Sequence, residues 1–400
     1  MAQTNRERAV KLLEWVKQNQ TDSVYAHLDF NTRKMIQKSQ LEGMWQQLVQ
    51  QVGEVDSEGE WMQDAVQGII LYYKDINFKR MPLRFVVSFD ADGQVNTLRF
   101  VPVPAAVKPV EAVFDSVRLE ERAMEVVTGE YHLPATLTFP RDGNNLPLVI
   151  LVQGSGPHDR DGSIGPNKVY RDLAWGLAEK GIAVLRFDKR TYIYKDKSVP
   201  KGMEITPKEE VIDDVLSAIR LAGNIKEVDT KRVFVAGHSL GGLLAPQIAK
   251  EADCLKGVIM LAASCRPLDK VMEEQIRYIA SLEGGVTEEQ IRQQIEQSKK
   301  MAPQAYWKWL QSYEPVMTAY GLTLPMLFLQ GERDYQVTMQ DFAMWKLGLF
   351  GKPNATFKSY PPLNHCFMEG EGKSTPMEYN HPARVSQSVI EDVADWILKN

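Results

Sequence analysis

The sequence predicts an α/β fold, a mostly parallel eight-stranded sheet with helices on both faces, and a small α+β domain before it. From residue 110 onward, short apolar runs alternate with amphipathic helical patterns, an order that builds parallel sheets. Before residue 104, two helical patterns are followed by strand-like runs. The chain has 400 residues, 44% hydrophobic and 25% charged, so it is long and apolar enough for two globular domains.

The first domain is expected over residues 1–104, before a linker marked by three prolines, Pro102, Pro104 and Pro109. Apolar residues at helical spacing predict helices over 5–18 and 41–52, and strands are expected over 69–73, 83–89 and 95–101. The pattern resembles the nuclear-transport-factor-like (NTF2-like) domains that precede some bacterial hydrolases, but it contains no chemical motif. We expect an accessory module, with homodimerisation through it as one option and ligand binding as another.

The second domain is expected over residues 110–400. Its strands are predicted over 117–126, 131–139, 148–152, 182–187, 233–236, 258–261, 326–330 and 356–360, and its helices over 170–178, 211–221 and 385–398. The interval between the sixth and seventh of these strands holds more than sixty residues with helical periodicity and no strand. Such a length is unusual for a simple crossover, so a helical cap is predicted over about 266–321.

One turn carries the first chemical signal. The strand 233–236 runs into Gly237-His238-Ser239-Leu240-Gly241, and a helical pattern follows at once. Strand, sharp turn and helix are the context in which a Gly-x-Ser-x-Gly motif presents a nucleophilic serine, here Ser239. With its antiparallel start and closing helix, the domain resembles the α/β-hydrolase fold.

A serine hydroxyl needs a base, and the base needs a carboxylate that orients it. In the α/β-hydrolase fold these partners follow the serine in the order acid, then histidine. Asp334 comes after the predicted strand 326–330 and is favoured as the acid, with Glu332 as the alternative. His365 follows the last strand closely and is favoured as the base over His381.

The negative charge on a tetrahedral intermediate needs hydrogen-bond donors. We expect the backbone N–H of Leu240 to be one donor and that of Ser155, in the glycine-rich loop after strand 148–152, to be the other, with Gly154 as second choice. Six residues are candidates for the lining of the substrate pocket: Gln153, His238, Tyr192, Tyr194, Trp307 and Trp309. The two tryptophans belong to an aromatic stripe at helical spacing, for which packing in the core of the cap is the alternative.

Five segments together resemble bacterial esterases of the dienelactone hydrolase and prolyl-oligopeptidase-like branch: 154–161, 186–190, 237–242, 330–334 and 363–365. The resemblance implies a carboxylesterase of short acyl esters with Ser-Asp-His chemistry and no metal or other cofactor. The chain departs from that pattern at residues 191–194, where a glycine-containing turn is usual, and this changes the expected pocket wall. A thioesterase, an acyltransferase or a peptidase would use the same three residues, and an inactive binding protein is the remaining alternative.

Composition bears on partners and location. The net charge of −5 and the absence of a Lys/Arg stripe argue against nucleic-acid binding. Three cysteines favour a reducing compartment over a disulfide framework. Since no signal peptide or membrane span is visible, a cytoplasmic enzyme is expected, with a trimmed export signal as the alternative.

Overall fold

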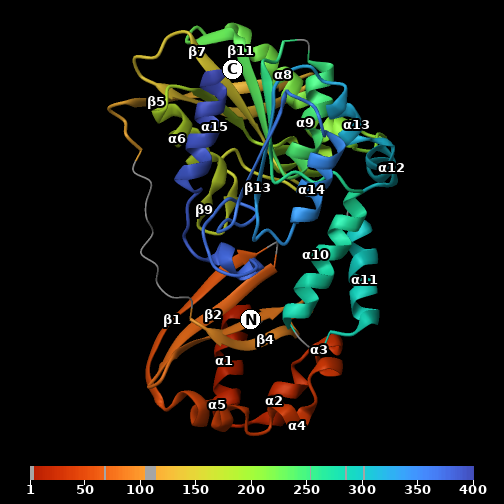
Figure 1. Ribbon diagram of the computed structural model, residues 1–400. Coiled ribbons are helices and arrows are strands. Elements are labelled where there is room, and N and C mark those ends of the chain that lie inside the picture. Colours follow the sequence, from red (N-terminus) through yellow and green to blue (C-terminus); the bar gives the residue numbers. More distant parts are fainter. Residues whose placement is uncertain (1–3, 67–68, 104–113, 253, 284–285, 301) are drawn as a thin grey trace. The chain divides into compact units, whose positions relative to one another are not determined.

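The computed structural model describes residues 4–66, 69–103, 114–252, 254–283, 286–300 and 302–400 (Figure 1). The chain divides into two compact units, Met1–Ala106 and Val107–Asn400. Each unit has its own hydrophobic core, and the candidate catalytic residues Ser239, Asp334 and His365 all lie in the second unit.

The first unit contains an antiparallel sheet in the order β1-β2-β3-β4. Its strands are β1 (Val55–Val66), β2 (Ile69–Phe78), β3 (Pro82–Phe89) and β4 (Val95–Pro102), and its helices are α1 (Asn5–Lys17), α2 (Thr21–Ala26), α3 (Phe30–Met35), α4 (Lys38–Leu41) and α5 (Met44–Val52). Helix α1 buries the predicted apolar stripe and begins with a capping box between Thr4 and Glu7.

Two details of this unit differ from the sequence prediction. The helix expected over 41–52 begins only at Met44, because Gly43 has a φ of 71° and separates α4 from α5. Strand β1 was not predicted, since its residues 56–60 are polar or glycine and show no apolar alternation.

The second unit contains an eight-stranded sheet in the order β14-β13-β12-β11-β7-β10-β6-β5. Its strands are β5 (Leu119–Thr128), β6 (Tyr131–Pro140), β7 (Leu146–Val152), β10 (Ala183–Phe187), β11 (Val228–His238), β12 (Gly257–Leu261), β13 (Met326–Gly331) and β14 (Ala355–Tyr360). Strand β6 pairs antiparallel with both β5 and β10, and the other pairs are parallel. The predicted α/β-hydrolase architecture is confirmed, down to its antiparallel start.

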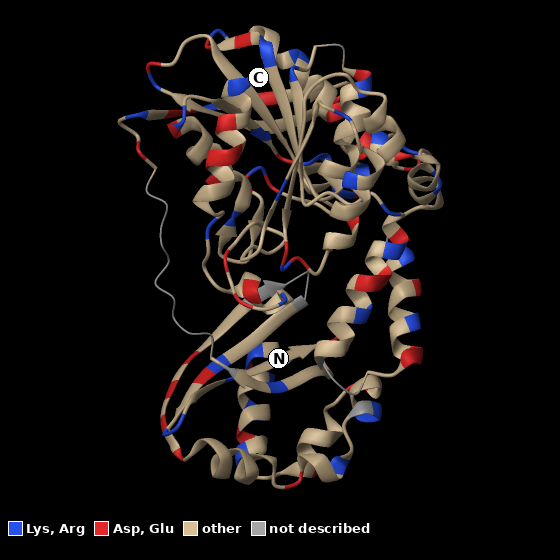
Figure 2. Cartoon of the chain, viewed as in Figure 1, with Lys and Arg blue, Asp and Glu red and all other residues tan. Residues whose placement is uncertain are grey.

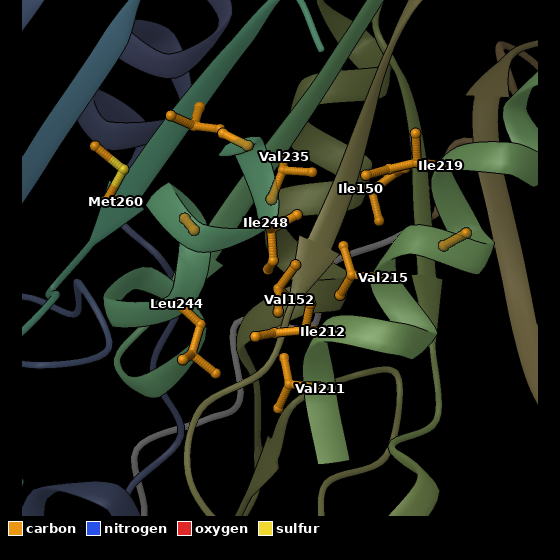
Figure 3. Close-up of a cluster of buried hydrophobic side chains, with 14 of the residues drawn as sticks. Ile150, Val152, Val211, Ile212, Val215, Ile219, Val235, Leu244, Ile248 and Met260 are labelled. Carbon is orange, nitrogen blue, oxygen red and sulfur yellow. The ribbon is translucent and has the colours of Figure 1, made fainter. Parts of the chain in front are cut away.

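The sheet has apolar side chains on both faces. All seven residues of β7 are buried; Ile150 and Val152 face one core cluster, whereas Val149 and Leu151 face the other. Helices α8 (Asp213–Leu221), α9 (Leu240–Glu251) and α14 (Met339–Gly348) supply the first cluster, seen in part in Figure 3. Helices α6 (Val169–Glu179) and α15 (Gln387–Lys399) supply the second. Two covered faces explain why these strands are continuous apolar runs.

Helices fill the described residues between β12 and β13: α10 (Leu268–Glu283), α11 (Glu288–Lys299), α12 (Gln304–Ser312) and α13 (Pro315–Tyr320). Acidic and basic residues are interspersed along α10 and α11 (Figure 2), where Arg277 forms ion pairs with Glu273 and Glu288. None of the helices in the described part of the chain is both long and apolar enough to span a bilayer.

Replacing Ile150 tests the central role of β7. Ile150→Ala leaves a cavity between β7 and the helices of the first cluster, so the free energy of unfolding of the second unit should fall by about 2–5 kcal/mol. Val127→Ala on β5, where the native side chain is 46% exposed, should change it by no more than about 0.5 kcal/mol. Denaturant unfolding followed by tryptophan fluorescence measures both, and equal effects would contradict this account of the core.

Candidate active site

Ser239 lies at a strained turn between β11 and α9. Its φ of 56° and ψ of −116° are rare for a residue with a side chain. A Cβ atom on Gly237 would lie 2.2 Å from the carbonyl oxygen of Gly241, and one on Gly241 would lie 2.5 Å from that of Val152. Only glycine allows these close approaches, so both glycines of the motif are needed for the turn itself.

Asp334 and His365 are joined by a short, buried hydrogen bond. The Nδ1 atom of His365 lies 2.7 Å from Oδ2 of Asp334, and the two residues are only 4% and 3% exposed. Because a carboxylate only accepts hydrogen bonds, Nδ1 carries the proton and Nε2 of His365 is left as an acceptor. This tautomer is the one that a general base requires.

The Asp334 carboxylate is held by three further donors. Oδ1 accepts from the backbone N–H groups of Gln336 at 2.7 Å and Val337 at 3.0 Å. Oδ2 also accepts from the side-chain amide of Gln330 at 3.1 Å. The carboxylate is therefore immobilised from two sides, and its orientation determines that of the imidazole.

Ser239 and His365 line the same pocket, which has a volume of about 190 Å³. Its polar lining includes Ser155, His158, Tyr170, His238, Ser264, Gln275 and Gln336, and its apolar lining consists of Ile164, Val169, Leu268, Val271 and Val337. None of the described residues that line the pocket is an Asp, Glu, Lys or Arg. Among the described residues no hydrogen bond joins the Ser239 hydroxyl to His365, a contact that often tightens only when substrate binds.

The loop after β7 passes directly beside Ser239. A Cβ atom on Gly154 would lie 3.2 Å from Cβ of Ser239. The N–H of Gly154 already donates to the Tyr170 hydroxyl, at 3.2 Å, so this second-choice oxyanion donor is occupied. For Ser155 and Leu240, the structure records no acceptor of the backbone N–H among the residues it describes. Neither of these two amides is therefore occupied by a described residue.

His238 joins the loop to the base. Its Nε2 atom lies 2.9 Å from the carbonyl oxygen of His365, and its Nδ1 atom lies 3.3 Å from the Tyr170 hydroxyl. Burial, with a smaller contribution from His365, lowers the pKa of His238 to about 3. A neutral ring must donate from Nε2 to the carbonyl, so it accepts from Tyr170 at Nδ1. The hydrogen bonds therefore run from His365 through His238 and Tyr170 to Gly154.

The other residues expected at the substrate pocket lie elsewhere. Gln153 is buried and its side-chain amide donates to the carbonyl of Phe187. Tyr192 is 46% exposed, and Tyr194 packs on Tyr131 and bonds the backbone of His132. Trp307 and Trp309 pack against the core cluster on the first face of the sheet. The aromatic stripe therefore forms a packed helix face, which is the alternative that the sequence left open for these tryptophans.

The rival residues considered for the triad also lie away from it. Glu332 accepts a hydrogen bond from Ser359 at an exposed position. The backbone carbonyl of His381 accepts from the side chain of Asn167. Cys366, which directly follows His365 in the chain, carries a further potential nucleophile. Its thiol is buried, and burial raises its pKa far above the ordinary value, which keeps it protonated and unreactive.

Several pocket residues were not predicted. The apolar wall comes from short segments around Ile164 and Val337, from Val169 at the start of α6, and from Leu268 and Val271 at the start of α10. Isolated apolar residues of this kind have no distinguishing pattern in a sequence. Gln330, which supports Asp334 from behind, gave one signal only, a polar side chain within an otherwise apolar strand. Tyr170 gave none, because its helix also carries Arg171, Asp172 and Glu179.

Comparisons with known proteins agree with this architecture. Residues 161–372 match the family described as serine aminopeptidase, S33, and residues 9–98 match a family of unknown function, DUF3887. The chain is 37% identical over 339 residues to esterase EstD of Thermotoga maritima, a match that covers 82% of this chain and 80% of that protein.

Two similar solved structures are named as esterases. An esterase from the archaeon Pyrobaculum calidifontis has a TM-score of 0.49 at 15% identity and covers 70% of this chain and 85% of its own. Est1E from Butyrivibrio proteoclasticus has a TM-score of 0.46 at 20% identity, with coverages of 69% and 98%. The family match spans more than half of the 400 residues. This chain therefore belongs to the serine aminopeptidase S33 family of α/β hydrolases and carries an N-terminal DUF3887 domain.

Proposed function

We propose that this carboxylic ester hydrolase cleaves small acyl esters through a triad of Ser239, His365 and Asp334 and a covalent acyl-enzyme. The observation that carries the proposal is the buried 2.7 Å hydrogen bond between His365 and Asp334, since His365 lines the same pocket as Ser239. The 37% identity to a protein named as an esterase supports the same class of reaction.

In the first half of the reaction, the Ser239 hydroxyl oxygen attacks the acyl carbon while its proton moves to Nε2 of His365. The carbonyl π electrons move onto oxygen, and the backbone N–H groups of Ser155 and Leu240 bind the resulting oxyanion. The C–O bond to the alcohol then breaks, and the alkoxide leaves with the proton from His365. Asp334 stays ionised throughout and stabilises the imidazolium.

In the second half, water attacks the acyl-enzyme and gives a proton to His365. The ester bond to Ser239 breaks, the serine oxygen recovers the proton, and a carboxylic acid is released. The enzyme is regenerated unchanged, so each turnover consumes one ester and one water.

The pocket favours small, neutral acyl groups. Its volume of about 190 Å³ lies below the range of about 300–1,000 Å³ that is typical of sites for larger ligands. An aminopeptidase must hold the ammonium group of its substrate, usually with a carboxylate. The described lining contains no Asp or Glu, which favours an ester over an unblocked peptide.

Replacing the nucleophile is the direct test of the triad. We expect Ser239→Ala to lower kcat on a nitrophenyl ester by about 10⁴-fold or more. Asp334→Asn should lower kcat by about 10³–10⁴-fold, because an amide would stabilise the wrong tautomer of His365. Both changes should leave the unfolding transition in place.

Ser217→Ala is the matched control, since Ser217 is a buried serine on α8 that does not line the pocket. Full activity of Ser239→Ala would show that another residue is the nucleophile. Parallel rates on acyl-CoA thioesters and on peptides test whether a thioesterase or peptidase activity exceeds that on esters.

Acyl chain length tests the pocket wall. With wild-type enzyme, kcat/KM should be highest for short acyl chains and should fall as the chain grows. Val271→Ala removes two methyl groups from the wall, so longer esters should gain about fourfold for each methylene accommodated. Ile276→Ala, a change at a buried residue of the same helix outside the pocket, should leave the profile unchanged. A Val271→Ala profile identical to that of the wild type would place the acyl group elsewhere.

A further inference from the structure

A buried lysine lies directly behind the loop that carries the expected oxyanion donor. Lys189 follows β10 and is only 2% exposed. Its Nζ atom lies 2.8 Å from the carbonyl oxygen of Gly154 and 3.0 Å from that of Gly156. The third partner of the ammonium is the carboxylate of Glu210, at 2.7 Å. All three N–H donors of the lysine are therefore used, two of them on the loop.

The two carbonyls flank Ser155, and one of them shares a peptide group with its N–H. In a trans peptide the C=O and N–H bonds are coplanar and point in opposite directions. An ammonium that holds the Gly154 carbonyl on one side therefore directs the Ser155 N–H to the other. A charged donor on the carbonyl also polarises the peptide, which makes its N–H a stronger donor.

The lysine is itself held by residues from two other elements. Glu210 is buried in a π-helical turn, Lys208–Ile212, that precedes α8, and such turns are frequent at functional sites. The second carboxylate oxygen of Glu210 accepts from the Tyr306 hydroxyl at 2.6 Å. Tyr306 is a buried residue of α12, and burial raises the pKa of its phenol far above the ordinary value, so it remains a donor.

We propose that Lys189 is a positioning residue that orients the Ser155 peptide for oxyanion binding, and that Glu210 and Tyr306 hold Lys189 in place. This inference rests on the proposed function, because it assigns a role to the same oxyanion loop. It predicts a loss of transition-state stabilisation with little loss of substrate binding.

A neighbouring ion pair provides a matched comparison. Arg190 and Asp214 are 3% and 1% exposed, and Nε of Arg190 lies 3.0 Å from Oδ2 of Asp214. The side chain of Arg190 contacts Asp214, the carbonyl oxygen of Ser198 and the ring of Tyr131, and no recorded contact joins it to residues 153–162, all of which the structure describes. Neutralising Arg190 and Asp214 should therefore cause the loss of folding stability that comes with removing a buried ion pair, but should leave the loop 153–162 in place.

The test compares K189M–E210Q with R190M–D214N on one nitrophenyl ester. We expect K189M–E210Q to lower kcat by about 10²-fold, the usual consequence of losing or misplacing one oxyanion donor. Its KM should stay within about threefold, since the lost interaction is made in the transition state. Affinity for an alkyl boronic acid, whose adduct with Ser239 is tetrahedral, should fall in parallel with kcat. R190M–D214N should retain kcat within about threefold once folding is confirmed by thermal unfolding.

A gentler variant keeps the proposal testable if the double variant does not fold. Tyr306→Phe removes one hydroxyl group and should lower kcat about three- to tenfold at unchanged KM, because Glu210 loses a donor. Equal kcat losses in K189M–E210Q and R190M–D214N, or an increase in KM at constant kcat, would overturn the proposal. Retained activity in Ser239→Ala would instead overturn the proposed nucleophile, so the two failures are distinguishable.

Discussion

The parallel arrangement of β11, β12, β13 and β14 is the constraint on which the site depends. Parallel strands present their carboxyl ends at one edge of a sheet, so the residues that follow β11, β13 and β14 meet there although they are far apart in the chain. Ser239 follows β11 directly, Asp334 follows β13 after two residues, and His365 follows β14 after four. The register between β13 and β14, in which Gly331 lies opposite Tyr360, brings the loops of the acid and the base together. A change that shifted this pairing would therefore move Asp334 and His365 apart even if both side chains stayed the same.

The second constraint concerns the proposed oxyanion donors, which are backbone groups. A backbone N–H cannot be aimed by its own side chain, so its direction must come from partners of the neighbouring peptide atoms. Around Gly154 these partners lie on both sides. The Tyr170 hydroxyl accepts from the Gly154 N–H, and the Lys189 ammonium donates to the Gly154 carbonyl. Two successive peptide groups are thereby held, and preorganised donors of this kind lose no energy to reorientation when charge develops.

The sequence predicts the residues whose chemistry has a local pattern. Ser239 lies in a motif that needs glycines at two positions, and Asp334 and His365 follow strands recognisable as apolar runs. The pocket wall has no such pattern. Leu268 and Val271 line it only because α10 begins beside the nucleophile, a fact of tertiary packing. Trp307 and Trp309, by contrast, belong to a clear aromatic pattern at helical spacing, but they pack against the hydrophobic core and do not line the pocket.

The pocket itself has no Asp, Glu, Lys or Arg in its described lining, and the charged groups lie behind it, where they contact its lining residues or the loop that carries them. With no Asp, Glu, Lys or Arg among the described lining residues, the oxyanion of the proposed mechanism would meet backbone dipoles and the imidazolium that forms on His365. Dipoles stabilise charge well only when they are rigid and shielded from water. Full charges are instead placed one step back: Asp334 behind His365, and Lys189 behind the Ser155 peptide. In the proposed mechanism, a neutral ester would therefore enter this pocket without desolvating an Asp, Glu, Lys or Arg side chain. Asp334 and Lys189 would stabilise the tetrahedral intermediate indirectly, because each orients the group that contacts it: the imidazole of His365 and the Ser155 N–H.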